Sequence, residues 1–167
     1  CLVVNGSRIP GAEDLITVRG QKYLQQADQI IYAGSLVNPA LLDMKKETAI
    51  VKNSAYMTLE EVIQAICEEE EKGGLTVRLH TGDPCLYGAI REQMDELDAR
   101  GISYEVCPGV SSFSGAAAAL QAEYTLPSIS QSVVITRMAG RTPVPERESI
   151  RAFAAHGATM VIFLSAG

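Results

Sequence analysis

Short apolar runs alternate with helix-like segments from one end of the chain to the other, and no other feature limits the fold as much. A short apolar run bounded by turn residues is typical of a buried strand, whereas apolar residues at intervals of three and four are typical of a helix. When strands and helices alternate, the strands form a parallel sheet that the helices cover. We therefore expect an α/β fold with a mostly parallel, five-stranded sheet and flanking helices, followed by the beginning of a second α/β domain.

The expected elements of the sheet follow from these runs. The expected strands are the apolar runs at residues 1–4, 29–33, 49–52, 75–79 and 104–107. The expected helices are the segments between and after them, at residues 14–27, 39–45, 58–72, 87–100 and 111–121. Two of these helices have recognisable first turns, because Asn38 precedes Pro39 and because Thr58 with Glu61 can form a capping box.

The chain also shows where one domain ends and another begins. Residues 124–131 contain a proline and several hydroxyl side chains, which is typical of a linker. We expect residues 1–123 to form the N-terminal domain and residues 132–167 to begin the second. The elements expected in the second domain are a strand, a helix and a strand, at residues 132–136, 146–155 and 159–164. The chain begins with Cys1 and stops directly after an apolar run, so we expect it to be part of a longer protein.

The charge and hydropathy of the chain exclude some partners. The chain has 14 Lys and Arg against 20 Asp and Glu, a formal net charge of -6, whereas nucleic-acid binding needs a basic surface. Its longest apolar runs, at residues 115–120 and 160–164, are far shorter than the roughly 20 residues that span a bilayer, and no signal peptide opens the chain. We expect a cytoplasmic protein that binds neither nucleic acid nor membranes.

The residues that could bind a metal are scattered along the chain. The four cysteines form no C-x-x-C pair, so we expect reduced thiols and no metal site. The acidic run at residues 68–71 would fan around a full helical turn, so we expect it on a solvated helix face. We expect His80 and His156 in loops or on the surface.

Two loops after apolar runs hold polar residues suited to ligand binding, since ligands of open α/β sheets bind beyond the carboxyl ends of the strands. The loop at residues 80–88 contains Gly82 and Asp83. The Asp83 carboxylate could bind a ribose or an amino group, or it could cap the next helix. The loop at residues 108–112 could bind an anion at a helix N-terminus, or Ser111 could simply cap that helix.

A third loop, at residues 136–146, carries two arginines on either side of a glycine. Arg137 and Arg141 could bind the carboxylates of an acidic substrate, or they could be solvated. Neither the Gly-x-Gly-x-x-Gly pattern nor the P-loop pattern occurs in the chain, so the usual dinucleotide and nucleoside-triphosphate sites are disfavoured.

Together these loops resemble those of the tetrapyrrole methylase family. The matching segments are the family's G-D-P-x-x-Y-G loop at residues 80–88, its P-G-[IV]-[ST]-[SA] loop at residues 108–112 and its opening turn at Pro10-Gly11. The resemblance implies a two-domain α/β enzyme, usually a homodimer, that takes S-adenosylmethionine as cofactor and methylates a tetrapyrrole.

The resemblance also implies roles for individual residues. The residues that it implies for the cofactor are Pro10, Thr81, Gly82, Asp83, Leu86, Ser111, Ser112 and Leu164. Those that it implies for the tetrapyrrole are Tyr87, Arg137 and Arg141. It implies no catalytic residue, because transfer from a sulfonium donor needs alignment and exclusion of water.

Within the family, residues 136–146 are similar to the segment typical of the precorrin-4 and cobalt-precorrin-4 C11-methyltransferases of cobalamin biosynthesis. Two alternatives remain. One is a uroporphyrinogen-III, siroheme-type or other corrin methyltransferase, and the other is a non-catalytic relic that binds a tetrapyrrole or a cofactor. The relic is favoured by Ser7, Arg8 and Ile9, which stand where the family has a glycine-rich opening.

Overall fold

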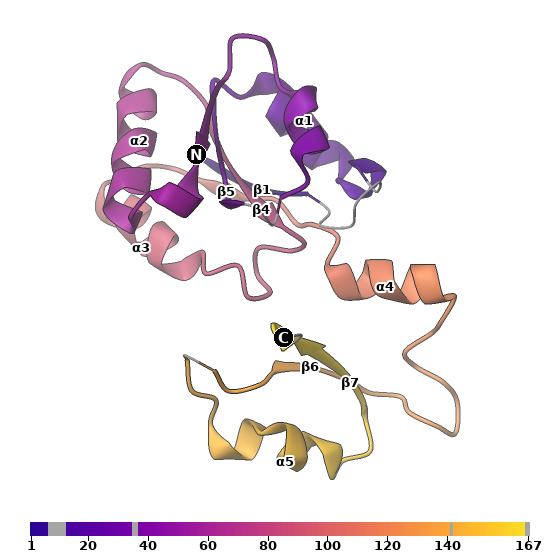
Figure 1. Cartoon of the computed structure of the whole chain (residues 1–167). Coiled ribbons are helices and arrows are strands. Elements are labelled where there is room, and N and C mark those ends of the chain that lie inside the picture. The colour runs from indigo at the N-terminus through magenta and orange to yellow at the C-terminus, as the bar shows by residue number, and fades with distance from the viewer. Residues whose placement is uncertain (7–12, 35–36, 141, 166–167) are drawn as a thin grey trace. The chain divides into compact units, whose positions relative to one another are not determined.

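The computed structural model describes residues 1–6, 13–34, 37–140 and 142–165. The chain divides into two compact units, Cys1–Gly115 and Ala116–Gly167. The first unit contains a five-stranded sheet and the second a two-stranded sheet (Figure 1). The limits that the sequence suggests for the two domains and the linker stay predictions.

The sheet of the first unit is parallel in every pairing that the structure describes. Its strands are β1 (Leu2–Gly6), β2 (Gln29–Tyr32), β3 (Ile50–Asn53), β4 (Thr76–Thr81) and β5 (Glu105–Val106). They lie in the order β3-β2-β4-β1-β5. The prediction of a parallel five-stranded α/β sheet is therefore confirmed.

Helices cover both faces of this sheet (Figure 1). The helices between the strands are η1 (Glu13–Leu15), α1 (Val18–Gln26), η3 (Pro39–Met44), η4 (Ser54–Tyr56), α2 (Leu59–Glu71) and α3 (Arg91–Ala99). The helix after β5, α4 (Ser112–Leu120), contains the boundary between the two units. One hydrophobic cluster packs Leu24 of α1 against Leu79 of β4. A second cluster packs Ile66 of α2 with Leu97 of α3, so α1 and the α2–α3 pair cover opposite faces.

The two predicted helix starts are confirmed. The Asn38 side chain accepts a hydrogen bond from the N–H of Ala40, with Pro39 in the first turn of η3. At the start of α2, the Thr58 hydroxyl accepts from the Glu61 N–H while the Glu61 carboxylate accepts from the Thr58 N–H. Each cap satisfies N–H groups that the first turn of a helix leaves without partners.

Three of the predicted helices are shorter than the sequence suggested. The helix expected from residue 87 begins only at Arg91, because Tyr87 and Ala89 have left-handed φ angles of 58° and 50°. The helix expected over 14–27 is interrupted at Thr17, whose side chain caps α1. The helix expected over 146–155 is interrupted in the same way at Ser149. Side-chain caps and left-handed residues end helices that apolar spacing alone would continue.

The acidic run on α2 is not uniformly solvated. Glu69 is only 7% exposed, its carboxylate pairs with the Lys72 ammonium at 3.1 Å, and its side chain packs over Gly74. The prediction of a solvated face is therefore wrong for Glu69, although the other three glutamates of the run are exposed.

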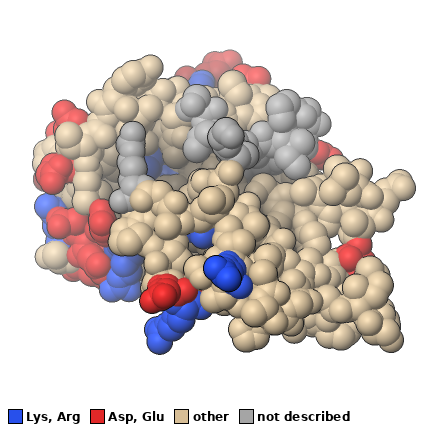
Figure 2. Space-filling view, turned by 60° about the horizontal axis from the view of Figure 1, so that its bottom comes forward, with Lys and Arg blue, Asp and Glu red and all other residues tan. Residues whose placement is uncertain are grey.

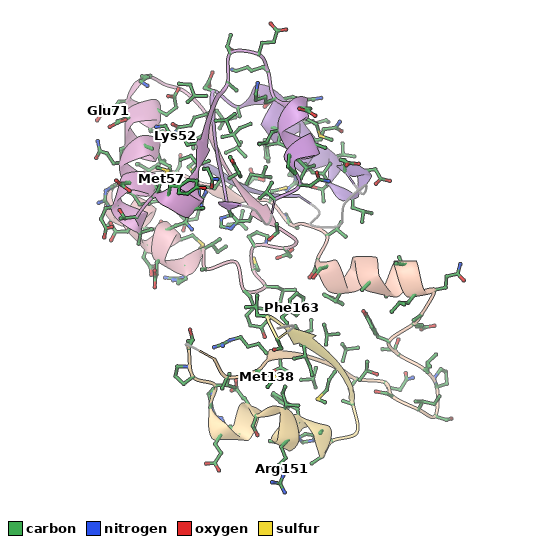
Figure 3. The ribbon with its side chains drawn as sticks, in the orientation of Figure 1. Lys52, Met57, Glu71, Met138, Arg151 and Phe163 are labelled. Carbon is green, nitrogen blue, oxygen red and sulfur yellow. The ribbon has the colours of Figure 1, made fainter. Side chains whose placement is uncertain are left out.

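The second unit is a β-α-β arrangement. Its elements are β6 (Val133–Arg137), η5 (Glu146–Glu148), α5 (Ile150–Ala154) and β7 (Thr159–Phe163). The two strands pair in parallel. In Figure 3, Arg151 of α5 points away from the two strands. None of the helices in the described parts of the chain combines the length and the apolar character that a membrane crossing needs.

Candidate functional site

The strand order places the candidate site between β1 and β4. These neighbouring strands are followed by helices on opposite faces, α1 after β1 and α3 after β4. Such a reversal opens a crevice beyond the carboxyl ends of the two strands, where open α/β sheets bind their ligands. Residues 7–12 of the loop after β1, including the predicted ligand Pro10 and the substituted Ser7 to Ile9, lie outside the described residues.

The structure brings two of the predicted loops together. Gly82, which follows β4 with a φ of 68°, lies so close to the other loop that an added Cβ would be 3.6 Å from Ser111 Cα and 3.7 Å from the Ser112 nitrogen. Thr81 is the last residue of β4. Four predicted cofactor residues, Thr81, Gly82, Ser111 and Ser112, thus lie in adjoining segments of one unit.

Asp83 links these loops through its carboxylate. One oxygen accepts a hydrogen bond from the Cys85 N–H at 2.8 Å, and the other accepts from the Gly109 N–H at 3.0 Å. Asp83 is half-buried. The first bond makes a local turn and does not cap the next helix, which begins only at Arg91, while the second joins the loop after β4 to the loop after β5.

The segment after Asp83 is a compact turn. The Leu86 N–H donates to the Asp83 carbonyl at 3.1 Å, and the Leu86 side chain is half-buried. Tyr87 is 42% exposed. Gly88 lies against the Pro84 carbonyl group, so a Cβ there would be 2.8 Å from the Pro84 carbonyl carbon. The glycine that ends the G-D-P-x-x-Y-G loop is therefore needed for a close backbone contact.

Three hydroxyl groups at these loops make no hydrogen bond to other described residues. Ser111 is 6% exposed, and its carbonyl accepts bonds from Ser114 and Gly115 at the start of α4. The hydroxyls of Thr81, Ser111 and Ser112 take part in no hydrogen bond among the residues that the structure describes. Together with the unused lone pairs of the Asp83 carboxylate, they fit a ligand that presents amino, hydroxyl and carboxylate groups, as S-adenosylmethionine does.

In the second unit, Arg137 closes the loop that follows β6. Its guanidinium donates to the carbonyl oxygens of Met138 at 3.3 Å, Thr142 at 3.1 Å and Pro143 at 3.2 Å. Sequence reasoning had considered only a carboxylate ligand or a solvated side chain for Arg137. Arg141 lies outside the described residues.

Leu164, the predicted cofactor residue of the second unit, follows directly after β7. It has a left-handed φ of 55° and is 72% exposed. Its side chain is therefore available for contact.

Two buried residues of β4, next to the site, were not predicted from the sequence. His80 was expected in a loop or on the surface, and that prediction is wrong, because His80 lies in β4 and is only 6% exposed. Its Nε2 atom has no hydrogen-bond partner among the residues that the structure describes. Burial, and secondly the charge of Arg78, lower the pKa of His80 to about 3, so the imidazole is neutral at pH 7.

Arg78 lies two residues earlier in β4 and faces the same side of the sheet. It is 5% exposed, and burial lowers its pKa to about 10. The signal that could have identified it is an arginine inside an otherwise apolar strand, since a buried cation must have specific partners.

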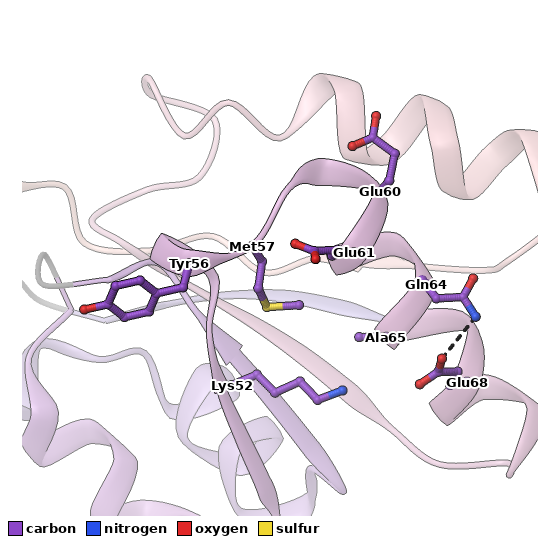
Figure 4. A pocket seen from close by; sticks show the side chains of 8 residues that line it. All are labelled: Lys52, Tyr56, Met57, Glu60, Glu61, Gln64, Ala65 and Glu68. Carbon is purple, nitrogen blue, oxygen red and sulfur yellow. Dashed lines mark hydrogen bonds between the residues drawn. The ribbon is translucent and has the colours of Figure 1, made fainter.

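The hollows that described residues of the first unit line include a groove along α2 and a cavity at the ends of two strands. The α2 groove has a volume of about 500 Å³ and is lined by Lys52, Tyr56, Met57, Glu60, Glu61, Gln64, Ala65 and Glu68 (Figure 4). A cavity of about 400 Å³ lies at the carboxyl ends of β2 and β3 and is lined by Tyr32, Gly34, Val37, Pro39, Leu42, Asn53, Ala55 and Tyr56. Neither hollow was predicted from the sequence.

The charged side chains that the structure describes are not gathered into a metal site. No cluster of three or more His, Cys, Asp or Glu that could hold a metal ion occurs among the described residues, and all four cysteines are free thiols. On the face in Figure 2, acidic and basic side chains lie beside one another and uncharged residues cover a broad area. Binding of an acidic ligand on this face would thus depend on individual cations.

Comparisons with known proteins agree with this architecture. The family described as Tetrapyrrole (Corrin/Porphyrin) Methylases matches residues 10–166. The chain is 54% identical over 155 residues to a cobalt-precorrin-4 C(11)-methyltransferase of Methanocaldococcus jannaschii, covering 93% of this chain and 60% of that protein. It is 45% identical over 158 residues to a precorrin-4 C(11)-methyltransferase of Mycobacterium tuberculosis, covering 94% and 63%.

A solved structure is similar over nearly the whole chain. The X-ray structure of the cobalt precorrin-4 methyltransferase CbiF superposes with a TM-score of 0.91 at 44% identity, covering 98% of this chain and 67% of that one. The chain spans about three fifths of the length of the curated relatives named above. With a match over residues 10–166, the chain belongs to the tetrapyrrole methylase family.

Proposed function

We propose that the protein is an S-adenosylmethionine-dependent methyltransferase that methylates C11 of precorrin-4 or cobalt-precorrin-4. The observation that carries the proposal is the junction of the loops after β4 and β5, where Gly82 lies against Ser111 and Ser112. This junction offers hydroxyls and a carboxylate beyond the carboxyl ends of parallel strands. The identity of 54% to a cobalt-precorrin-4 C(11)-methyltransferase supports the choice of substrate.

In this proposal the loops of the first unit bind and orient the cofactor. The hydroxyls of Thr81, Ser111 and Ser112 and the carboxylate of Asp83 bind its polar groups, and Gly82 lets it approach the backbone. Leu86 packs against its apolar part. Pro10 and Leu164 complete the proposed cofactor set. When bound, the cofactor supplies a methyl group on a sulfonium centre.

The contribution of the protein to the reaction is alignment and exclusion of water. Holding donor and acceptor in line removes much of the entropic barrier without an acid-base group. Ser111 is buried, so its hydroxyl can hold a polar group of the cofactor away from water, which accords with that role. We propose Tyr87, Arg137 and Arg141 for the tetrapyrrole, whose carboxylates would otherwise be repelled by a chain of net charge -6.

The remaining expectations about the whole protein are part of the same proposal. We infer a homodimer and a cytoplasmic location from the family resemblance. These inferences concern the complete protein, of which this chain is expected to be a part.

The experiment is methyl transfer by the complete protein. S-adenosylmethionine labelled in its methyl group is incubated with precorrin-4 or cobalt-precorrin-4, and mass spectrometry and NMR identify the product. One added methyl group at C11 is expected. Addition at another carbon would favour the uroporphyrinogen-III, siroheme-type or other corrin methyltransferases. Binding of S-adenosylhomocysteine in a calorimeter without any transfer would favour the non-catalytic relic, and no binding at all would refute the proposal.

A further inference from the structure

We propose that Arg78 and Gln93 are positioning residues that hold the turn carrying Leu86 and Tyr87 in the conformation that binds the cofactor. The inference rests on the proposed function for the identity of the ligand. The contacts themselves lie within the first unit and connect the centre of the sheet with the end of the turn.

Arg78 is the fixed end of this chain of contacts. Its Nε donates to the Gln93 side-chain oxygen at 2.9 Å, and one terminal nitrogen donates to the Ile31 carbonyl at 2.7 Å and to the Ser54 hydroxyl at 3.4 Å. No carboxylate pairs with it in the described parts of the chain. Burying a cation without a counter-ion costs free energy, so Arg78 is expected to stabilise the core less than an apolar residue would at the same position. A role in geometry accounts for it better.

Gln93 connects Arg78 to the turn because its side chain has an oxygen that accepts hydrogen bonds and an amino group that donates them. The guanidinium of Arg78 only donates, so the Gln93 oxygen must face it and the Gln93 amino group must face the other way. That amino group donates to the Ala89 carbonyl at 3.3 Å. Gln93 is buried, its hydrogen bond with Arg78 is buried, and its hydrogen bond with Ala89 is half-buried. The charge of Arg78 thereby determines that Ala89 meets a donor.

The backbone of Ala89 has an unusual conformation that its surroundings must hold in place. Its φ of 50° is left-handed, as is that of Tyr87 at 58°, and non-glycine residues adopt this region only when the surroundings hold them there. The neighbouring N-cap of α3, Ile90, provides no side-chain hydrogen bond. The Gln93 side chain thus holds the Ala89 carbonyl at the exit of the turn, where Ile90 makes no side-chain hydrogen bond of its own.

The turn is therefore fixed at both ends. Asp83 holds its entry to Gly109 at 3.0 Å, and Gln93 holds its exit at Ala89. Leu86 and Tyr87 lie between these two contacts. Loss of either contact should let the intervening residues change conformation without unfolding the sheet.

Gln93→Glu in the complete protein separates positioning from stability. A carboxylate still accepts from Arg78, as an ion pair, so the melting temperature should stay equal or rise. It cannot donate to Ala89, and its charge repels that carbonyl. We expect S-adenosylhomocysteine to bind roughly two- to tenfold more weakly by calorimetry, the effect of one neutral hydrogen bond.

Amide exchange of the ligand-free protein gives a readout that does not depend on the cofactor. In Gln93→Glu, residues 85–90 should exchange faster, by roughly two- to tenfold, while β4 keeps its protection. Gln64→Glu is the matched control, because Gln64 is an exposed helical glutamine that donates only to Glu68, at 3.1 Å. It should change neither the exchange of residues 85–90 nor the affinity.

Gln93→Asn is the second variant and introduces no buried charge. Its shorter side chain cannot reach both Arg78 and Ala89, so the same faster exchange is expected. Unchanged exchange of residues 85–90 in both variants would overturn the inference. Failure of the unaltered protein to bind S-adenosylhomocysteine would instead refute the proposed function, while the exchange data would still decide the role of Gln93.

Discussion

The Asp83 carboxylate accepts a hydrogen bond from the N–H of Gly109, a residue 26 positions further along the chain, at 3.0 Å. No covalent bond fixes the distance between two loops that follow different strands of a parallel sheet. This bond fixes the distance between the loops after β4 and β5, where the proposed cofactor residues lie. Asp83 is thus a structural link in addition to being a proposed ligand.

Asp83→Ala should therefore reduce both stability and affinity. Two backbone N–H groups lose a charged acceptor, so we expect the free energy of unfolding to fall by about 1 to 3 kcal/mol. We also expect S-adenosylhomocysteine to bind roughly tenfold more weakly or worse. Urea denaturation and calorimetry measure the two effects. Asp43→Ala, at an exposed position of η3, is the control, and an equally small effect of both variants would contradict the linking role of Asp83.

Gly88→Ala should disrupt the turn after β4. An added methyl group would overlap the Pro84 carbonyl group, which is backbone and cannot rotate away. We expect a loss of stability of about 1 to 3 kcal/mol, as for other overpacked sites, together with weaker cofactor binding. Gly140→Ala is a suitable control because a Cβ at Gly140 would meet nothing within 4 Å. If Gly88→Ala had the melting temperature and the cofactor affinity of the wild type, the turn would be free to shift.

His80 should make stability depend on pH in the weakly acidic range. Its pKa is about 3 in the folded protein and 6.5 as the ordinary value, so the unfolded chain binds the proton more readily. The contribution of His80 to the free energy of unfolding is therefore fully present above about pH 6.5 and is lost as the pH decreases toward 3. Between pH 7 and pH 5 this group alone should remove about 2 kcal/mol.

Comparison of unfolding at pH 7 and pH 5 in His80→Leu tests this. The variant should lack the loss of stability that His80 causes, so its curve should be flatter than that of the wild type. His156→Leu, at an exposed position, should leave the curve unchanged. Parallel curves for wild type and His80→Leu would mean that the buried imidazole is protonated at no cost.

Arg137→Gln should loosen the loop after β6 and weaken binding of the tetrapyrrole. The loop loses three hydrogen bonds from one guanidinium, so amide exchange at residues 138–140 and 142 should rise. Tetrapyrrole affinity should fall most at low salt, where charge is least screened. Affinity for S-adenosylhomocysteine should stay within roughly twofold. Arg151→Gln, on the exposed side of α5, is the control, and loss of cofactor binding alone would reverse the assignment.

Much of the fold follows from local sequence. The apolar runs predict the seven strands that the structure describes, with shifts of at most two residues at their ends, because burial on a sheet needs a short uninterrupted apolar segment. The caps at Asn38 and Thr58 depend only on residues within the next turn, so they too can be recognised without tertiary information.

The contacts of the candidate site depend on tertiary structure. The sequence shows Gly82, Asp83 and Ser111 at strand ends, but only the strand order reveals that Asp83 meets Gly109. The burial of His80 depends on helices that pack over β4, and the wrapping of Arg137 around its own loop depends on loop conformation. The roles proposed for these residues toward cofactor and substrate stay predictions.

The strand order also has a consequence for synthesis of the protein on the ribosome. β1 pairs with β4 and β5 and with neither β2 nor β3. In that pairing Leu2 lies opposite Val77. At about 5 to 20 residues per second, the partner of β1 emerges roughly 4 to 15 seconds after β1 itself. β2 and β3, which are neighbours both in sequence and in the sheet, can pair well before then. During this interval the apolar β1 has no partner strand, so its edges stay open for as long as β4 is still being synthesised.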